Sequence, residues 1–165
     1  MRRRYVGIGM VFVLWGLSVG WAQSGRAPGL VLLTPQEAEV LRLTEEEWAE
    51  PMGIKAKALG PLIVVQAPKP QETPQGPTIV TVTPMDLTVL FEAQGVAVDM
   101  TSLRVQGRKG LFSKDLTALL RPYVQGTRVE AQGVQVPAGR FKLEMEITDR
   151  QGTKTAETYR VEIKE

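Results

Sequence analysis

The sequence of 165 residues contains no cysteine, no histidine and no asparagine. Because there is no cysteine, the chain forms no disulfide bonds, and its fold depends on the burial of apolar side chains. The absence of histidine removes the commonest general base and the commonest transition-metal ligand in proteins. The absence of asparagine removes every N-glycosylation sequon. Any acid–base chemistry would therefore depend on carboxylates or lysine side chains.

The first 22 residues have the pattern of a secretory signal peptide. Three arginines, Arg2 to Arg4, precede an apolar run from Tyr5 to Gly20, and Ala22 follows as a second small residue. This arrangement predicts a signal peptide at 1–22, cleavage after Ala22, and a periplasmic or secreted protein. The alternative is an uncleaved anchor, because the apolar run is near the shortest that spans a bilayer. In that case the signal segment would be the contact of the chain with a membrane.

The charge balance gives no sign of nucleic-acid binding. The whole chain has 20 Lys and Arg residues against 18 Asp and Glu residues. Loss of Arg2, Arg3 and Arg4 with the signal peptide would leave 17 basic residues against 18 acidic ones. Since no cluster of basic residues stands out, the sequence predicts no nucleic-acid partner.

The segment 23–60 contains two capping boxes, each a threonine followed three residues later by a glutamate. The boxes are Thr34 with Glu37 and Thr44 with Glu47. A capping box satisfies the free backbone N–H groups at the start of a helix, so we predict short helices at 35–42 and 45–50. The segment 23–60 is therefore expected to be helical or extended and to precede the main domain.

From residue 61 onward the sequence consists of short apolar runs separated by glycine and proline. The proline-rich stretch 68–77 is expected to be a semi-rigid loop. About seven of the runs alternate apolar and polar residues, as strands with one buried face do. One predicted helical turn interrupts them. Its apolar residues recur at helical spacing and are Leu116, Leu119, Leu120 and Tyr123. This organisation predicts an antiparallel β-sandwich over residues 61–165.

The last two runs form a predicted β-hairpin. Residues 141–147 alternate apolar and polar side chains, and Asp149 and Gly152 suit the two ends of a type I turn. The resulting register places three couples on one face. They are Leu143 with Tyr159, Phe141 with Val161, and Gly139 with Ile163. Glu157 is the misfit, because it falls opposite Met145 on the apolar face. It must lie at the rim of the sheet or have a partner.

The C-terminal part carries a recognisable pattern. Pro137, Gly139 and Phe141 precede the alternating strand, the turn 149–152 and the final strand 153–163. With these features the chain resembles a bacterial immunoglobulin-like (fibronectin-III-like) domain of an exported protein. The resemblance implies a mainly β fold, an antiparallel immunoglobulin-like β-sandwich preceded by the signal peptide and the short helical segment. It implies no particular reaction, because such sandwiches carry many roles.

Few residues suggest catalysis or metal binding. Glu144 and Glu146 share the polar face of their strand, and paired carboxylates can hydrolyse glycosides. A charged sheet face with cross-strand ion pairs is the simpler interpretation. Four acidic residues in or beside predicted loops could bind calcium, but they lack calcium-loop spacing and suit turns or helix caps. These residues are Asp86, Asp99, Asp115 and Asp149.

We therefore predict a non-enzymatic module without catalytic residues, cofactor or metal. Its expected role is protein binding or structural spacing in the bacterial cell envelope, with another envelope protein as partner, through edge strands or loops. Leu90 and the run 31–33 are candidate contact residues, although packing with the N-terminal helices is the favoured interpretation. The alternative is an envelope protein that binds or cleaves glycan with carboxylates, using Glu144 or Glu157. That alternative requires a cleft with a buried carboxylate.

Overall fold

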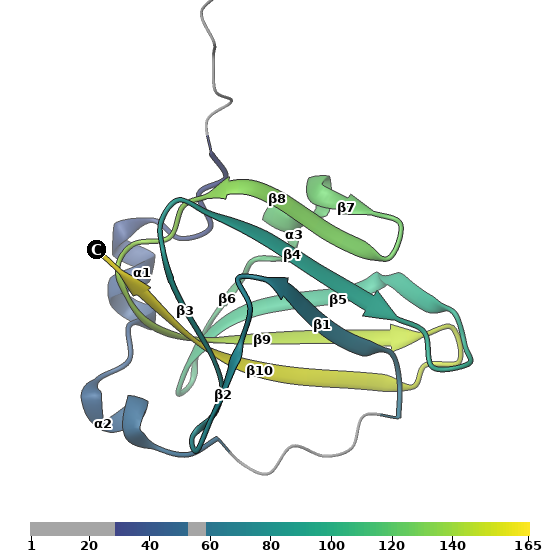
Figure 1. Cartoon of the computed structure of the whole chain (residues 1–165), viewed down its shortest axis with the longest axis horizontal. Helices are drawn as coiled ribbons and strands as arrows, with labels where there is room; N and C mark the ends of the chain where they lie inside the picture. Colours follow the sequence, from purple (N-terminus) through teal and green to yellow (C-terminus); the bar gives the residue numbers. More distant parts are fainter. Residues whose placement is uncertain (1–28, 53–58) are drawn as a thin grey trace, which may run out of the picture.

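The computed structural model describes residues 29–52 and 59–165, which form two facing β-sheets and several short helices (Figure 1). The predicted signal peptide lies outside the described residues. The strands are β1 Leu62–Ala67, β2 Gln71–Thr73, β3 Gly76–Val82, β4 Met85–Glu92, β5 Val98–Lys109, β6 Phe112–Asp115, β7 Val124–Gln125, β8 Arg128–Val134, β9 Gly139–Asp149 and β10 Lys154–Lys164. The helices are α1 Pro35–Leu41, α2 Glu45–Ala49, α3 Thr117–Leu120 and the 3-10 helix η1 Arg121–Tyr123. Among the described residues, no helix is long and apolar enough to cross a membrane.

The strand order is that of an immunoglobulin-like sandwich. The smaller sheet has the order β1-β4-β8-β7, and the larger sheet has the order β2-β3-β10-β9-β5-β6. Lettered along the chain, these strands give the A-B-E-D sheet and the G-F-C sheet with an added C′ strand, which is the immunoglobulin arrangement. The predicted fold class is therefore confirmed. One pair departs from an antiparallel sandwich, because β3 runs parallel to β10.

The predicted C-terminal hairpin is present as β9 and β10 with the expected register. Leu143 lies opposite Tyr159, and the other two predicted couples pair in the same way. The Asp149 N–H donates to the Thr153 carbonyl at 3.1 Å, and Gly152 occupies the left-handed region with a φ of 83°. The alternation in the sequence thus places the apolar side chains of both strands against the smaller sheet.

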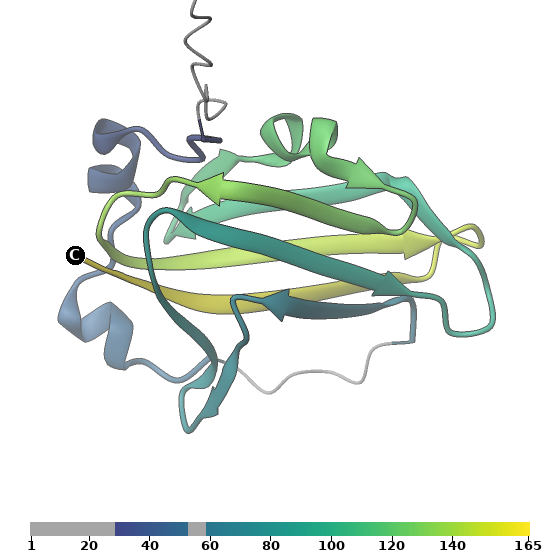
Figure 2. The same ribbon diagram turned by 45° about the horizontal axis from the view of Figure 1, so that its top comes forward.

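The two N-terminal helices are present and begin at their capping boxes. In each box the threonine hydroxyl accepts the glutamate N–H, and the glutamate carboxylate accepts the threonine N–H. α1 buries Ala38 and Leu41 in the hydrophobic core of the sandwich, and Leu32 and Leu33 of the preceding segment join the same core. Figure 2 shows α1 against one end of the two sheets. The domain boundary predicted at residue 60 stays a prediction, but residues before it complete the core.

The stretch 68–77 is not the plain loop that its prolines suggested. It contains β2 and the start of β3, which pair as an antiparallel hairpin at the edge of the larger sheet. Thr73 Oγ1 donates to the Gly76 carbonyl at 2.7 Å, and Gly76 has a φ of 115°, which favours glycine. Pro77 precedes the residues through which β3 pairs with β10, so its missing N–H costs nothing in that ladder. The turn at residues 73–76 therefore allows β2 and β3 to pair although prolines lie on both sides of β2.

Candidate functional site

The carboxylates on the polar face of β9 are held in ion pairs. Glu144 contacts Arg108 of β5 at 2.5 Å, and Glu146 contacts Lys154 of β10 at 2.6 Å. The cross-strand ion pairs expected on this face are therefore present. Because a cation neutralises each carboxylate, neither of them is arranged as a free acid or base.

Glu157 is buried on the inner face of the larger sheet, with 7% of its surface exposed, and it does not lie at the rim. Tyr159 Oη donates to the Glu157 carboxylate at 2.6 Å and also lies 3.5 Å from the Ile63 carbonyl oxygen. Burial raises the pKa of Tyr159 above its ordinary value, and the bond to Glu157 raises it further. Glu157 pairs with Met145 across the sheet, so Glu144 belongs to the opposite face. The two glutamates do not form one carboxylate pair.

The four acidic residues expected in or beside loops lie at or next to the ends of strands, and each accepts a backbone N–H group. Asp149 accepts the N–H groups of Gln151 and Thr153 at 2.8 and 2.9 Å. Burial works to raise the pKa of Asp149, but these bonds outweigh it and hold the pKa below its ordinary value. The other N–H donors are Thr101 to Asp99, Thr117 to Asp115 and Gly133 to Asp86. Among the described residues, no three acidic side chains gather as a metal site requires.

The segment after α1 carries Trp48 of α2 onto the outer face of the larger sheet. The Leu43 N–H donates to the Arg140 carbonyl at 2.8 Å. The Trp48 ring then stacks on the Arg160 guanidinium, whose Cζ lies 3.9 Å from the ring centroid, and it lies 5.2 Å from Cζ of Arg140. Arg160 also donates to the Trp48 carbonyl. Because no residue of α2 is buried, surface contacts hold α2 in place, namely these cation–π contacts and the ion pairs of Glu45 with Arg140 and of Glu47 with Lys109.

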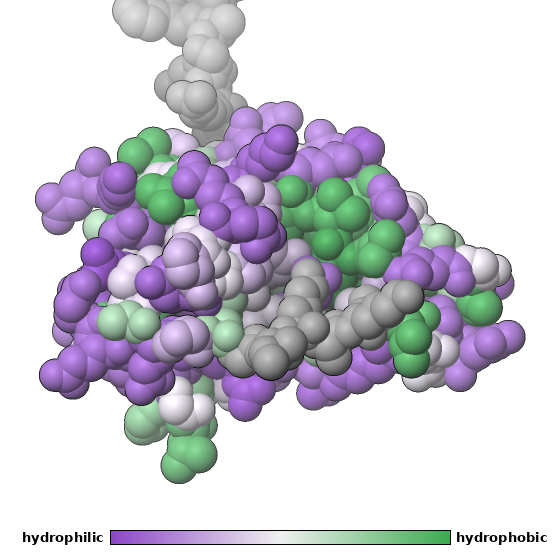
Figure 3. All heavy atoms as spheres, turned by 60° about the horizontal axis from the view of Figure 1, so that its bottom comes forward, coloured by the Kyte–Doolittle hydropathy of each residue, from purple (hydrophilic) through white to green (hydrophobic). Residues whose placement is uncertain are grey.

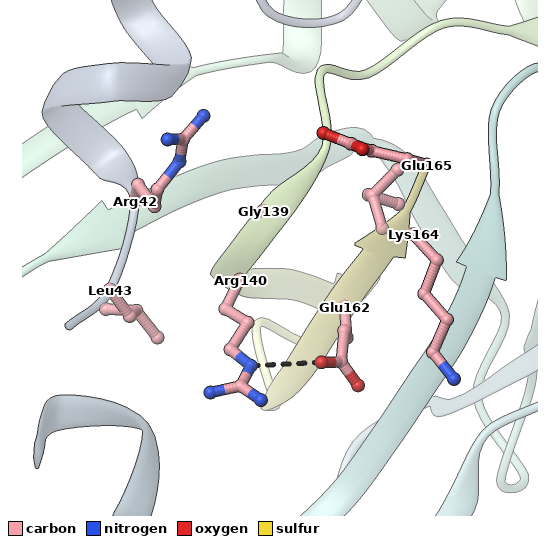
Figure 4. A pocket seen from close by; sticks show the side chains of 8 residues that line it. Arg42, Leu43, Gly139, Arg140, Glu162, Lys164 and Glu165 are labelled. Carbon is pink, nitrogen blue, oxygen red and sulfur yellow. Dashed lines mark hydrogen bonds and ion pairs between the residues drawn. The ribbon is translucent and has the colours of Figure 1, made fainter. Parts of the chain in front are cut away.

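An open pocket of about 440 Å³ lies beside this cluster (Figure 4). On one side Arg140 Nε donates to the Glu162 carboxylate at 3.0 Å, and Arg42 lies on the other side. The bond to Glu162 raises the pKa of Arg140, and the ion pair with Glu45 of α2 also raises it. Arg42 is in turn paired with Glu39. Both arginines of the pocket therefore already have carboxylate partners.

The turn between β5 and β6 exposes two large apolar side chains. Leu111 is fully exposed and Phe112 is 64% exposed. Gly110 has a φ of 53°, and no atom lies within 4 Å of the place that a side chain would occupy, so the turn stands clear of the molecule. In Figure 3 it projects at the lower edge as hydrophobic spheres beyond a mostly hydrophilic surface. The sequence reasoning missed this pair, although two apolar residues directly after a turn glycine were a visible signal.

The contact residues expected from the sequence lie in different environments. Leu32 and Leu33 are buried in the core, as the packing interpretation expected, while Val31 is 48% exposed. Leu90 is half-buried on the outer face of the smaller sheet, opposite Val64 of β1. α1 packs on β5, β6 and β9, and α2 lies on the larger sheet. Packing with the N-terminal helices is therefore the wrong explanation for Leu90.

The comparisons with known proteins identify no family. No family model matches the chain, and no curated protein matches it. Among solved structures, murine CRIg is similar at a TM-score of 0.34 and 11% sequence identity, over 63% of this chain and 99% of that chain. A likeness at this level carries no argument, so the immunoglobulin-like class rests on the strand order of the two sheets. That class defines a scaffold for variable surfaces and assigns no reaction.

Proposed function

We propose that the chain is an exported, non-enzymatic immunoglobulin-like module that binds another protein of the bacterial cell envelope through the tip of the β5–β6 hairpin. The observation that carries this proposal is the exposure of Leu111 and Phe112 on one projecting turn. Exposure of large apolar side chains to water costs free energy, and contact with a partner removes that cost. A structural spacer has no use for such a tip, so binding is the better-supported role. Export rests on the signal pattern of residues 1–22.

The test compares capture of envelope proteins by variants of residues 23–165. The double variant L111S/F112S removes the apolar tip. Leu59→Ser is the matched control, because Leu59 is 75% exposed. Its neighbour Gly60 packs against Thr153 in the β9–β10 turn, at the other end of the sandwich. We expect the wild type and the control to retain one stoichiometric partner, and the double variant to lose most of it. Equal recovery by all three chains would refute binding through the tip.

The alternative role, binding or cleavage of envelope glycan, is favoured by the burial of Glu157. A buried carboxylate is what acid catalysis of glycoside hydrolysis requires. Glu144 points away from Glu157, however, so a second carboxylate would have to come from another strand or loop. Release of soluble sugar from isolated cell wall measures this role. We expect no release by the wild-type chain. Release that is lost in Glu157→Gln would establish the alternative.

A further inference from the structure

The outer face of β5, β9 and β10 carries more cations than carboxylates. Its carboxylates are Asp99, Glu144, Glu146 and Glu162. Its cations are Arg104, Arg108, Arg140, Lys142, Lys154, Arg160 and Lys164. Asp99 accepts hydrogen bonds from Thr101, and each of the three glutamates is paired with a cation. The pairs are Glu144 with Arg108, Glu146 with Lys154, and Glu162 with Arg140. Positive charge is therefore left over on this face of the sheet.

Three of the cations stand in one row across adjacent strands. Arg108 of β5 is directly opposite Lys142 of β9, and Lys142 is directly opposite Arg160 of β10. Like charges directly opposite one another on a sheet repel and destabilise it. In a neighbouring row Arg140 is opposite a carboxylate instead, that of Glu162. Arg108 is paired with Glu144, so Lys142 and Arg160 are the cations of this row that have no carboxylate partner among the described residues.

Arg160 has unused hydrogen-bond donors although it is almost completely buried. It is 3% exposed, and within the described part of the chain its Nε and Nη1 atoms have no hydrogen-bond partner. Burial lowers the pKa of Arg160, and the charge of Arg140 lowers it further. Neither Arg160 nor Lys142 forms an ion pair with any of the described residues. A buried guanidinium in this state is costly unless an acceptor is supplied.

We propose that Lys142 and Arg160 bind an oxyanion, namely a carboxylate, sulfate or phosphate group, at the margin of α2. The anion accepts hydrogen bonds from Nε and Nη1 of Arg160 and from Nζ of Lys142, and it neutralises the row of like charges. Lys142 is half-buried, so it meets the anion at the edge of the covered area. α2 has 5 residues and buries none, so a shift that admits the anion breaks surface contacts, among them the ion pairs of Glu45 with Arg140 and of Glu47 with Lys109, and no core packing. The site uses no residue of the hairpin tip, so the two proposals stand or fall separately.

The test uses Trp48 as the reporter, because its ring stacks on Arg160. The chain has 3 tryptophans, and the double substitution W15F/W21F leaves Trp48 as the remaining indole of the full chain. Trp48 fluorescence is followed while sodium sulfate, phosphate or acetate replaces sodium chloride at constant ionic strength. We expect a saturable change with the oxyanion and none with chloride. A stronger response to acetate identifies a carboxylate site, and a stronger response to sulfate or phosphate identifies a tetrahedral oxyanion site.

Variants in the same background decide whether the named residues bind the anion. Lys142→Met and Arg160→Met should each weaken binding about tenfold or more, which is the worth of a hydrogen bond to a charged group. Lys154→Met is the matched control, since it removes a cation of the same face that is already paired with Glu146. Its affinity should stay close to that of the wild type. A response equal to that of chloride, or unchanged binding in Lys142→Met, would overturn the proposal. If Arg160→Met does not fold, Lys142→Met decides alone.

Discussion

Glu157 and Arg160 lie close together on β10 but face opposite sides of the larger sheet, and both are buried. Glu157 accepts a short hydrogen bond from Tyr159, at 2.6 Å. Arg160 stacks beneath Trp48 and leaves two nitrogen atoms without a partner among the described residues. Buried charges cost free energy unless hydrogen bonds compensate them. The free energy of unfolding should therefore fall when Glu157 loses its hydrogen-bond donor. It should stay the same or rise when the Arg160 charge is removed.

Tyr159→Phe tests the compensation of Glu157. The substitution keeps the aromatic ring in the core and removes the hydroxyl donor. We expect the free energy of unfolding to fall by about 1–3 kcal/mol, because a buried carboxylate then loses a hydrogen bond. Urea unfolding at pH 7 measures the change. An unaltered unfolding midpoint would show that the hydrogen bond from Tyr159 to Glu157 contributes nothing to the stability of the protein.

Arg160→Met tests the cost of the buried guanidinium. Methionine has a similar reach and needs no hydrogen-bond acceptor. We expect the free energy of unfolding to stay the same or to rise by up to about 2 kcal/mol, because apolar replacements of buried charges are often stabilising. Loss of the cation–π contact with Trp48 opposes this gain by about 1 kcal/mol. Unfolding is measured in chloride buffer without oxyanions. A large decrease in stability would contradict the view that Arg160 is poorly compensated.

α1 is attached to the sandwich at its first turn as well as through its buried face. The Glu37 carboxylate accepts the Thr34 N–H at 2.9 Å and contacts Lys114 of β6 at 2.6 Å. Together these bonds lower the pKa of Glu37 from 4.5 to about 2, with the Lys114 bond the largest cause. Leu41 meanwhile packs over Gly107 of β5, where a side chain would come within 3.1 Å of it. The capping box therefore stabilises the start of α1, and the ion pair and the buried leucine attach α1 to the sandwich.

The low pKa of Glu37 predicts an acid-sensitive contribution of α1. The folded-state pKa lies below the ordinary value, so this stabilisation is present above about pH 4.5 and is lost as the pH falls toward about 2. In Glu37→Gln the unfolding midpoint should decline less steeply over that window. Lys114→Met should flatten the decline in the same way, because it removes the largest cause of the shift. A wild-type slope in both variants would contradict the role of this ion pair.

Elements with local signals could be predicted from the sequence. The threonine and glutamate spacing located both N-terminal helices, and the alternation over residues 141–147 fixed the register of β9 with β10. β2 was missed because the prolines on both sides of it indicated a loop, whereas the turn at Gly76 determines the pairing. The alternation also singled out Glu157, but it gave no means to choose between a rim position and a buried one.

The candidate binding surfaces depend on contacts that no local pattern records. Trp48 and Arg160 are far apart in the sequence. They are in contact because the segment between α1 and α2 is bonded to the start of β9, where the Leu43 N–H donates to the Arg140 carbonyl. The row of Arg108, Lys142 and Arg160 exists because β5, β9 and β10 are neighbours in the larger sheet. A count of charges along the chain cannot reveal it. Strand order therefore had to be known before either feature could be recognised.

The molecule as a whole shares one hydrophobic core between the sandwich and the segment before it. Leu32, Leu33, Ala38 and Leu41 belong to the same cluster as Phe91 and Ile147 of the two sheets. The segment also pairs with the sandwich through its backbone, since the Leu32 N–H donates to the Gln135 carbonyl at 3.0 Å. Residues 30–41 thus contribute to the stability of the sandwich and are not a detached arm.

Truncation tests this shared core. A chain that begins at residue 61 loses four buried leucines, Leu32, Leu33, Leu41 and Leu43. Each large-to-small loss in a core costs about 2–5 kcal/mol. The total is comparable with the whole stability of a domain, about 5–15 kcal/mol. We expect residues 61–165 to lack a cooperative thermal transition, whereas residues 29–165 should show one. Circular dichroism measures both. Equal melting temperatures would mean that the sandwich folds independently of the N-terminal segment.

The proposed binding role has its most direct test in one incubation with two readouts. Residues 23–165 are mixed with isolated cell envelope, and both the retained proteins and the soluble sugar are quantified. We predict one stoichiometric protein partner and no sugar above the level of buffer alone. Sugar release that disappears in Glu157→Gln, with no protein partner retained, would contradict the binding role and establish a glycan-cleaving one.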